Sequence, residues 1–378
     1  MQQAINFIHD GLHLTPLEYV QALQPDAEAG SIHPDSYSNG GIVEELERKF
    51  AHWLGKPHAV FMPTGTLANH LALRELAGPY KKVIVQAESH LYNDTGDCAQ
   101  TLSGLNLIPL APHQAAFSLE QVQDVVRTIR SGRVETRVGV ISIETPVRRQ
   151  DDAMFGYDDM QRIASFARQE GIKLHLDGAR LFVESAHTGI APAQYAALFD
   201  TVYVSLSKCF NAAAGAILAG PVALTENLYH IRRMFGGSLA QAWPNAAVAL
   251  QFVDDFIEAY RSAWREAETL FQLLDDHHAF RVEHIPDGTH IVRLHIANTN
   301  LKQFRDRLMQ HHIHLPPVTS GQGWFSLKIN PSLNRSCGRA LAEAFMGCIG
   351  KKKLPAGKRS ARPSTHGDNL KFAMGDSR

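Results

Sequence analysis

The chain has 378 residues, of which 44% are hydrophobic and 20% are charged, and its formal net charge is −1. This size and composition predict a soluble globular protein with a full core and two domains. A nearly neutral chain lacks the positive field that attracts nucleic acid or membrane surfaces, so neither is an expected partner. The cysteines are too scattered for a disulfide framework, and neither a secretion signal nor a membrane-spanning segment is expected. A cytoplasmic location is expected.

Residues 40–220 alternate between helical and strand patterns. Helical spacing of apolar residues predicts helices that begin near Ile42, Thr66 and Tyr157. Short apolar runs predict strands at 59–62, 82–85, 138–141, 172–176 and 201–205. Strands that alternate with helices favour a large, mostly parallel sheet covered on both faces, in an α/β fold. Ligands of such sheets bind at the carboxyl ends of the strands.

The second half of the chain predicts a smaller α+β domain. An amphipathic stretch from about Asn245 to Asp275 bridges to it, and strand patterns at 289–295 and 324–329 flank a helix near Phe304. The predicted organisation is an N-terminal arm (1–30), a large domain (31–245), a small C-terminal domain (246–350) and a basic tail (351–378). The tail is rich in Lys, Arg, Ser, Gly and Pro, which predicts disorder.

One acid and one amine follow neighbouring predicted strands. Asp177 ends the run 172–176, and Lys208 comes just after the run 201–205. Pyridoxal phosphate (PLP) needs this pair, because an amine binds its aldehyde and a carboxylate keeps its ring nitrogen protonated. The pair therefore predicts PLP as the cofactor, with Lys208 and Asp177 as catalytic residues.

Other residues fit around this pair. Gly65 and Thr66 lie between a strand and a helix, where backbone N–H groups bind phosphate, although an ordinary capped turn would look the same. His90 follows a strand and could stack on the cofactor ring and transfer protons. Arg180 could bind the ring oxygen or a substrate carboxylate, and its spacing equally allows a local ion pair with Asp177.

Three motifs resemble the threonine aldolase/β-eliminating lyase group of fold-type I PLP enzymes. They are the runs 175–182 (HLDGARLF), 206–208 (LSK) and 63–69 (PTGTLAN). The resemblance implies that Lys208 carries the cofactor, Asp177 contacts the ring nitrogen and His90 stacks on the ring. It also implies the roles given above for Arg180, Gly65 and Thr66, a small amino acid substrate, and homodimers or homotetramers with shared active sites.

The chain departs from that pattern on the substrate side. His9 begins a His-Asp-Gly run where the family has Ser-Asp-Thr. The run 144–149 (ETPVRR) stands where the family has Asn-Thr-His after an acidic residue, so the histidine that handles the substrate hydroxyl has no match. The family's carboxylate-binding arginine aligns with Ser326, which leaves Lys328 as a substitute. His9, Arg180 and Lys328 are therefore the expected substrate contacts. The histidine clusters at 277–278 and 311–314 lack acid or cysteine partners, so no metal site is expected.

Three functions remain open at this point. The first is a PLP-dependent lyase that cleaves the Cα–Cβ bond of a β-hydroxy-α-amino acid, giving glycine and an aldehyde. The second keeps PLP but catalyses β-elimination, racemisation or transamination, as the altered substrate side suggests. The third is a PLP-binding regulatory subunit with impaired catalysis. The fold alone does not choose among them.

Overall fold

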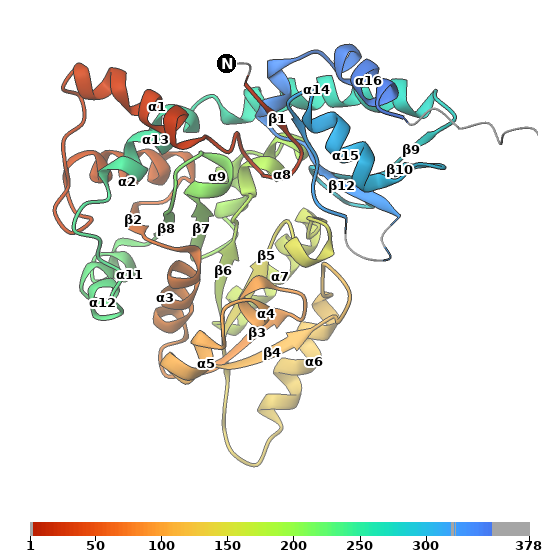
Figure 1. The fold of residues 1–378 in the computed structure, drawn as a ribbon. Coiled ribbons are helices and arrows are strands. Elements are labelled where there is room, and N and C mark those ends of the chain that lie inside the picture. Colours follow the sequence, from red (N-terminus) through yellow and green to blue (C-terminus); the bar gives the residue numbers. More distant parts are fainter. Residues whose placement is uncertain (1–2, 319–320, 322, 350–378) are drawn as a thin grey trace, which may run out of the picture.

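A seven-stranded sheet forms the centre of the large domain in the computed structural model, which describes residues 3–318, 321 and 323–349 (Figure 1). Only one strand, β8, runs antiparallel to its neighbours. The strand order is β2 (His58–Met62), β8 (Ala216–Gly220), β7 (Thr201–Ser205), β6 (Lys173–Asp177), β5 (Val138–Glu144), β3 (Lys82–Gln86) and β4 (Asn106–Leu110). The predicted α/β class with a mostly parallel sheet is confirmed. The predicted tail, 351–378, lies outside the described residues.

Burial explains which strands the sequence predicts. Every residue of β5, β7 and β8 is buried, because helices cover both faces of the sheet. The edge strand β4 was not predicted, since it is partly exposed and contains Pro109, which is tolerated at a sheet edge. The strand β8 was also missed, because its Ala- and Gly-rich sequence carries little strand signal.

Helices on the two faces of this sheet form separate hydrophobic clusters. One cluster includes Ile42 of α2 and Met160 of α7, and another on the α3 side includes Leu71. The predicted starts near Ile42, Thr66 and Tyr157 correspond to α2 (Gly41–Trp53), α3 (Gly65–Ala77) and α7 (Tyr157–Glu170). The remaining helices of this domain are α4 (His90–Asn93), α5 (Cys98–Ser103), α6 (Leu119–Arg130), α8 (Leu181–Thr188), α9 (Pro192–Ala196), α10 (Leu206–Cys209), α11 (Val222–Thr225) and α12 (Leu228–Met234).

The small domain packs around an antiparallel sheet in the order β12-β10-β9. Its strands are β9 (Phe280–His284), β10 (Ile291–Ile296) and β12 (Trp324–Lys328), and its helices are α14 (Phe256–Asp275), α15 (Leu301–Met309) and α16 (Gly338–Gly347). The amphipathic stretch that leads into it forms two helices, α13 (Trp243–Val253) and α14. Asp254 lies at the break, where its carboxylate accepts bonds from Lys49 (2.5 Å) and Trp53 (3.1 Å) of α2.

The N-terminal segment crosses between the domains. The short strand β1 (Ile5–Asn6), labelled in Figure 1, pairs in parallel with β11 (Ile313–His314). Phe7 is fully buried in the small-domain core. The helix α1 (Pro16–Glu28) lies instead against α13. Residues 8–14 therefore pass from the small domain back to the large one. Among the described residues, no helix is both long and apolar enough to cross a bilayer.

Candidate active site

A pocket of about 320 Å³ lies where β5, β6 and β7 end and α3 begins. It is at the carboxyl edge of the sheet, where ligands of open α/β sheets bind. All of the predicted cofactor residues line it: Gly65, Thr66, His90, Asp177, Arg180 and Lys208. The other predicted substrate contacts, His9 and Lys328, line an adjoining cavity described below.

Asp177 is held at the end of β6 by a buried chain of polar groups. Its Oδ2 accepts a 2.5 Å bond from the Asn69 amide, and its Oδ1 accepts a bond from the Ala179 N–H. The Asn69 Oδ1 is 2.9 Å from the Nε2 of His175, and the Nδ1 of His175 is 2.8 Å from the Thr201 hydroxyl. Burial lowers the pKa of His175 to about 4, so this ring is neutral at pH 7. The sequence motifs contain Asn69 and His175 but gave neither a role.

Lys208 lies on α10, directly after β7, and lines the pocket. Burial, and then the positive charge of Arg180, lower the pKa of Lys208 from its ordinary value, against the opposing effect of Asp177. A lowered pKa increases the fraction of unprotonated amine near neutral pH. The amine is thus chemically suited to nucleophilic attack on an aldehyde.

The start of α3 offers backbone donors to the pocket. Thr64 caps the helix by accepting a bond from the Leu67 N–H, whereas the N–H groups of Gly65 and Thr66 have no acceptor among the described residues. A Cβ atom at position 65 would collide with the ring and hydroxyl of Tyr203. Glycine is therefore required here by close packing, and the free N–H groups suit an anion such as phosphate.

Glu144, at the end of β5, organises the wall beside His90. Its carboxylate accepts a 2.5 Å bond from the His90 N–H and a 3.0 Å bond from the Arg148 N–H. Burial and the nearby Asp177 raise the pKa of Glu144 to about 8, while both backbone donors favour the charged form. Burial also lowers the pKa of the His90 ring. Glu144 thus fixes the backbone on which His90 enters the pocket.

Arg180 does not form the local ion pair with Asp177 that its spacing allowed. Its guanidinium lies instead 3.1 Å from Asp10 and 3.5 Å from Asp152, and it is only 4% exposed. Although burial acts in the opposite direction, these two carboxylates raise the pKa of Arg180 above its ordinary value. Folding brings Asp10 and Asp152 from distant segments of the chain. These two carboxylates pair with Arg180 in place of the sequence neighbour Asp177.

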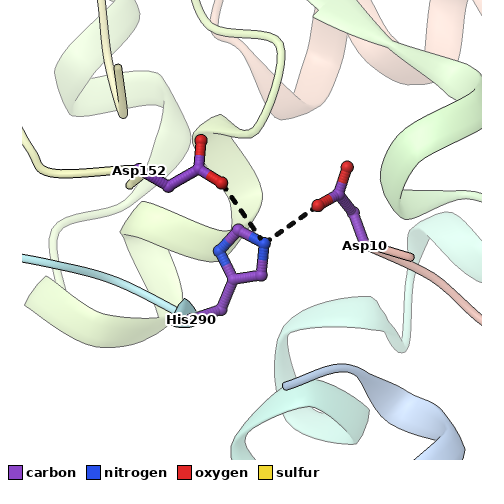
Figure 2. A group of neighbouring side chains, drawn as sticks. All are labelled: Asp10, Asp152 and His290. Atoms are coloured by element: carbon purple, nitrogen blue, oxygen red, sulfur yellow. Dashed lines mark hydrogen bonds and ion pairs between the residues drawn. The ribbon is translucent and has the colours of Figure 1, made fainter. Parts of the chain in front are cut away.

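Asp10 and Asp152 meet His290 in a buried cluster that sequence reasoning missed (Figure 2). The Nε2 atom of His290 is 2.9 Å from Asp10 and 3.6 Å from Asp152, and the Lys328 ammonium is 2.6 Å from Asp10. Burial opposes ionisation of Asp10, but Arg180, His290 and Lys328 together hold its pKa well below its ordinary value. Since Arg180 and Lys328 already balance the two carboxylates, the cluster has no charge deficit that a metal ion would fill.

A second cavity of about 400 Å³ adjoins the pocket on the N-terminal side. His9, Lys328 and Lys208 all line it, so Lys208 borders both spaces. The rings of His9 and His13 stack with their centroids 3.6 Å apart. Burial, and then His13, lower the pKa of His9. We call this space the N-terminal cavity.

The fold and this site define a class, the α/β proteins with the fold of fold-type I PLP enzymes. The sequence model of the Beta-eliminating lyase family matches residues 16–297, and the chain belongs to this family.

Curated relatives are similar over part of their length. The chain is 29% identical over 238 residues to the low-specificity L-threonine aldolase of Candida albicans, which covers 62% of this chain and 63% of that protein. It is 27% identical over 249 residues to the enzyme of the same name from Saccharomyces cerevisiae, covering 65% and 63%. A Cochliobolus carbonum protein named alanine racemase TOXG is 28% identical over 241 residues, covering 63% and 60%. The chain thus spans less than two thirds of the length of these relatives.

Solved structures share the fold over nearly the whole chain. An Exiguobacterium protein assigned as an aromatic amino acid beta-eliminating lyase/threonine aldolase has a TM-score of 0.77 at 23% identity, covering 92% of this chain and 97% of that one. A Listeria monocytogenes protein assigned as an L-allo-threonine aldolase has a TM-score of 0.76 at 23% identity, covering 92% and 96%.

Proposed function

We propose that the protein is a PLP-dependent lyase that cleaves the Cα–Cβ bond of a β-hydroxy-α-amino acid into glycine and an aldehyde. The observation that carries this proposal is that the Lys208 amine and the Asp177 carboxylate line one pocket, at the ends of adjacent strands. Membership of the Beta-eliminating lyase family and the names of the two yeast relatives support it.

The residues present fit PLP. Lys208 would hold the cofactor aldehyde through its amine, and Asp177, fixed by Asn69 and Ala179, would accept the ring N–H. The unpaired N–H groups at the start of α3 would bind the phosphate. When bound, PLP supplies an electron sink for the bond that breaks.

His90 would lie against the ring. Cleavage removes a proton from the β-hydroxyl and delivers one to Cα, so the pocket needs groups that exchange protons near neutral pH. Burial lowers the pKa of Lys208 from 10.5 toward neutrality, and it lowers the pKa of His90 below 6.5, which favours the neutral ring that can accept a proton. Arg180, His9 and Lys328 remain the proposed substrate contacts.

Borohydride reduction tests the cofactor site. The purified protein with PLP should absorb visible light, and reduction should bleach it and attach PLP to the peptide that contains Lys208. Lys208→Ala should lose both signals, whereas Lys173→Ala, at an exposed lysine paired with Asp200, should keep them. Equal labelling of the Lys208→Ala protein would exclude this site.

A product assay tests the reaction. Threonine, β-phenylserine and cysteine are offered side by side, and aldehyde, glycine and pyruvate are measured. Aldehyde and glycine in equal amounts, absent with Lys208→Ala, are the expected result. Pyruvate without aldehyde would favour β-elimination, and no turnover of any amino acid by a PLP-loaded protein would favour the regulatory subunit.

Racemisation is the second candidate. A relative is named alanine racemase, and the run 144–149 has no match for the histidine that handles the substrate hydroxyl in the family. A pocket without that histidine could still exchange the α-proton of alanine. Interconversion of L- and D-alanine without aldehyde formation from threonine would establish this alternative.

A homo-oligomer in the cytoplasm is also proposed. In the single chain α1 buries no residue, and Leu17 and Val20 are 55% and 61% exposed, which suits a contact with a second copy. The cysteines at 98, 209, 337 and 348 are unpaired, as is usual in a reducing compartment. Light scattering should give a dimer or tetramer, and Val20→Glu should shift it toward monomer.

A further inference from the structure

Arg148 is a cation on the wall of the pocket that the proposed function leaves unused. It begins a short 3-10 turn, Arg148–Gln150, just after β5, and it lines the pocket together with His90 and Asp177. Its side chain is 53% exposed. Because an arginine keeps its charge at any physiological pH, a permanent positive charge lies where the pocket meets solvent.

The backbone of Arg148 is held in place from two sides. Its N–H donates to Oε1 of Glu144 at 3.0 Å, and Oε2 of the same carboxylate accepts the His90 N–H. Next to it, the Val147 N–H donates to the Ala153 carbonyl at 2.8 Å, which closes the loop. Burial lowers the pKa of His90, and the positive charge of Arg148 adds to this effect. One carboxylate thus places His90 and Arg148 side by side on one wall.

The guanidinium of Arg148 has donors to spare. It carries five N–H donors, and its one side-chain hydrogen bond to another described residue runs from Nη1 to Asp94, at 3.3 Å. Asp94 also accepts a 3.1 Å bond from Arg149, so this carboxylate keeps a cationic partner without Arg148. Water screens a pair as exposed as Arg148 and Asp94, and such a pair contributes little to stability. Arg148 can therefore turn two parallel N–H groups toward a second carboxylate.

The position of Arg148 indicates which carboxylate this is. His9 and Lys328, the contacts proposed for the α-carboxylate, line the N-terminal cavity, whereas Arg148 lines only the pocket. Lys208, where the substrate amine would be held, borders both spaces. A substrate whose α-carboxylate points into the N-terminal cavity has its side chain left to extend along the pocket. Arg148 therefore faces the side chain, the part of the substrate that leaves as the aldehyde.

The size of the pocket limits that side chain. Its volume of about 320 Å³ must also hold the cofactor, so the space that remains suits a short substituent. A carboxylate bonded directly to Cβ is short, and its two oxygens match two parallel guanidinium N–H groups. The phosphate of the cofactor has its own donors, the N–H groups of Gly65 and Thr66, and does not need Arg148.

We propose that Arg148 determines specificity by binding a carboxylate on the substrate side chain, so that the substrate class is the β-hydroxy-α-amino dicarboxylic acids, with 3-hydroxyaspartate as the smallest member. This inference rests on the proposed function and names its substrate class. In 3-hydroxyaspartate the β-hydroxyl loses its proton, the Cα–Cβ bond breaks, and the electron pair of that bond goes to Cα, which takes up one proton. The products are glycine and glyoxylate.

The first test compares substrates that differ only in the group on Cβ. The threo and erythro isomers of L-3-hydroxyaspartate are each paired with their methyl counterparts, L-threonine and L-allo-threonine, and kcat/KM is measured for all four. The parent protein should prefer the carboxylate member of at least one pair. Arg148→Met should lower the carboxylate-to-methyl ratio of kcat/KM about 10- to 100-fold, the size of a charged hydrogen bond.

Two further variants sharpen this test. Arg148→Lys keeps the charge but loses the parallel donors, so its ratio should lie between those of the parent and Arg148→Met. Arg162→Met is the matched control, because Arg162 is an exposed arginine of α7 that pairs with Asp159 and does not line the pocket. Its ratio should equal that of the parent.

The second test measures binding without turnover. L-Aspartate and L-alanine lack the β-hydroxyl and differ by one side-chain carboxylate. Both are titrated into the PLP-loaded protein, and their dissociation constants are read from the visible absorbance. Arg148→Met should weaken aspartate relative to alanine by about 10- to 100-fold. Both ligands carry an α-carboxylate, so a role of Arg148 at that group would weaken both alike, and this result would overturn the assignment.

A parent protein that prefers the methyl substrate in both pairs would overturn the proposed substrate class, as would unchanged ratios in Arg148→Met. A protein that borohydride does not label at Lys208, and whose absorbance responds to neither aspartate nor alanine, would instead overturn the proposed function. The two failures are therefore distinguishable.

Discussion

The proposed cofactor pocket and the buried cluster of Asp10, Asp152, Arg180, His290 and Lys328 are built in different ways. In the pocket, Asp177 ends β6 and pairs in register with Tyr203 of β7, five residues before Lys208 in the chain. In the cluster, Asp10 contacts Lys328 across 318 residues of sequence, and each partner comes from a different segment. The first site follows from the edge of one sheet, whereas the second exists only when the N-terminal segment and the small domain dock against that edge.

This difference teaches where function can vary within such a fold. The ends of adjacent parallel strands lie at a fixed spacing. The sheet itself therefore fixes the geometry of a cofactor site placed at these ends. Side chains brought by a second domain can be exchanged without disturbing the sheet. The expected departures of this chain from the family pattern, at His9, in the run 144–149 and at Ser326 and Lys328, all concern the proposed substrate contacts.

The largest expected effect on activity comes from substituting Asp177, the acidic member of the Asp177–Lys208 pair. Asp177→Asn removes the negative charge that would face the ring nitrogen, and kcat/KM should fall by about 100- to 1000-fold. Asp200→Asn, at an aspartate just before β7, is the control and should remain within about twofold. Steady-state kinetics with β-phenylserine measure both variants. Full activity of Asp177→Asn would remove the basis for the proposed cofactor role.

The second prediction concerns the close packing at the start of α3. Gly65→Ala places a Cβ atom against Tyr203, so the loop must move and PLP affinity should fall about 10- to 100-fold. Gly347→Ala, at a helical glycine with no neighbouring atom within 4 Å, should leave PLP affinity unchanged. Titration of the cofactor-free proteins with PLP provides the comparison, and equal affinities would contradict the packing argument.

The third prediction concerns His175, where the expected effect on activity is the smallest. The quantity predicted here is the pH dependence of the free energy of unfolding. The folded-state pKa of about 4 lies below the ordinary 6.5, so the unfolded chain binds the extra proton first. His175 therefore contributes stability above pH 6.5 that is lost as the pH falls toward 4, by about 3 kcal/mol in total.

His175→Gln isolates this contribution. The variant should be about 1 kcal/mol less stable at pH 7, because a buried hydrogen bond to Asn69 is weakened. Its free energy of unfolding should then fall less steeply with acidification than that of the parent. Urea unfolding at several pH values measures both curves. His187, whose pKa is also lowered to about 4, is present in both proteins, so parallel curves would refute the assignment to His175.

Local patterns predicted the large domain well. Apolar runs marked β3, β5, β6 and β7, since strands buried on both faces read as continuous hydrophobic segments. The same local patterns did not predict β4, which is an edge strand, or β8, whose small residues have little strand preference. The residues that line the pocket were found because each follows a predicted strand by a short step in the sequence.

The sequence by itself determined which residues line the pocket at the carboxyl edge of the sheet, since Asp177, Lys208, Gly65, Thr66 and His90 follow strands whose relative positions a parallel sheet dictates. Only the tertiary structure decided what surrounds Arg180. The near neighbour Asp177 was an available partner, yet Asp10 and Asp152 form the ion pairs. The physical reason is that burial makes a charge require close partners, and folding, not sequence spacing, determines which carboxylates are buried beside it.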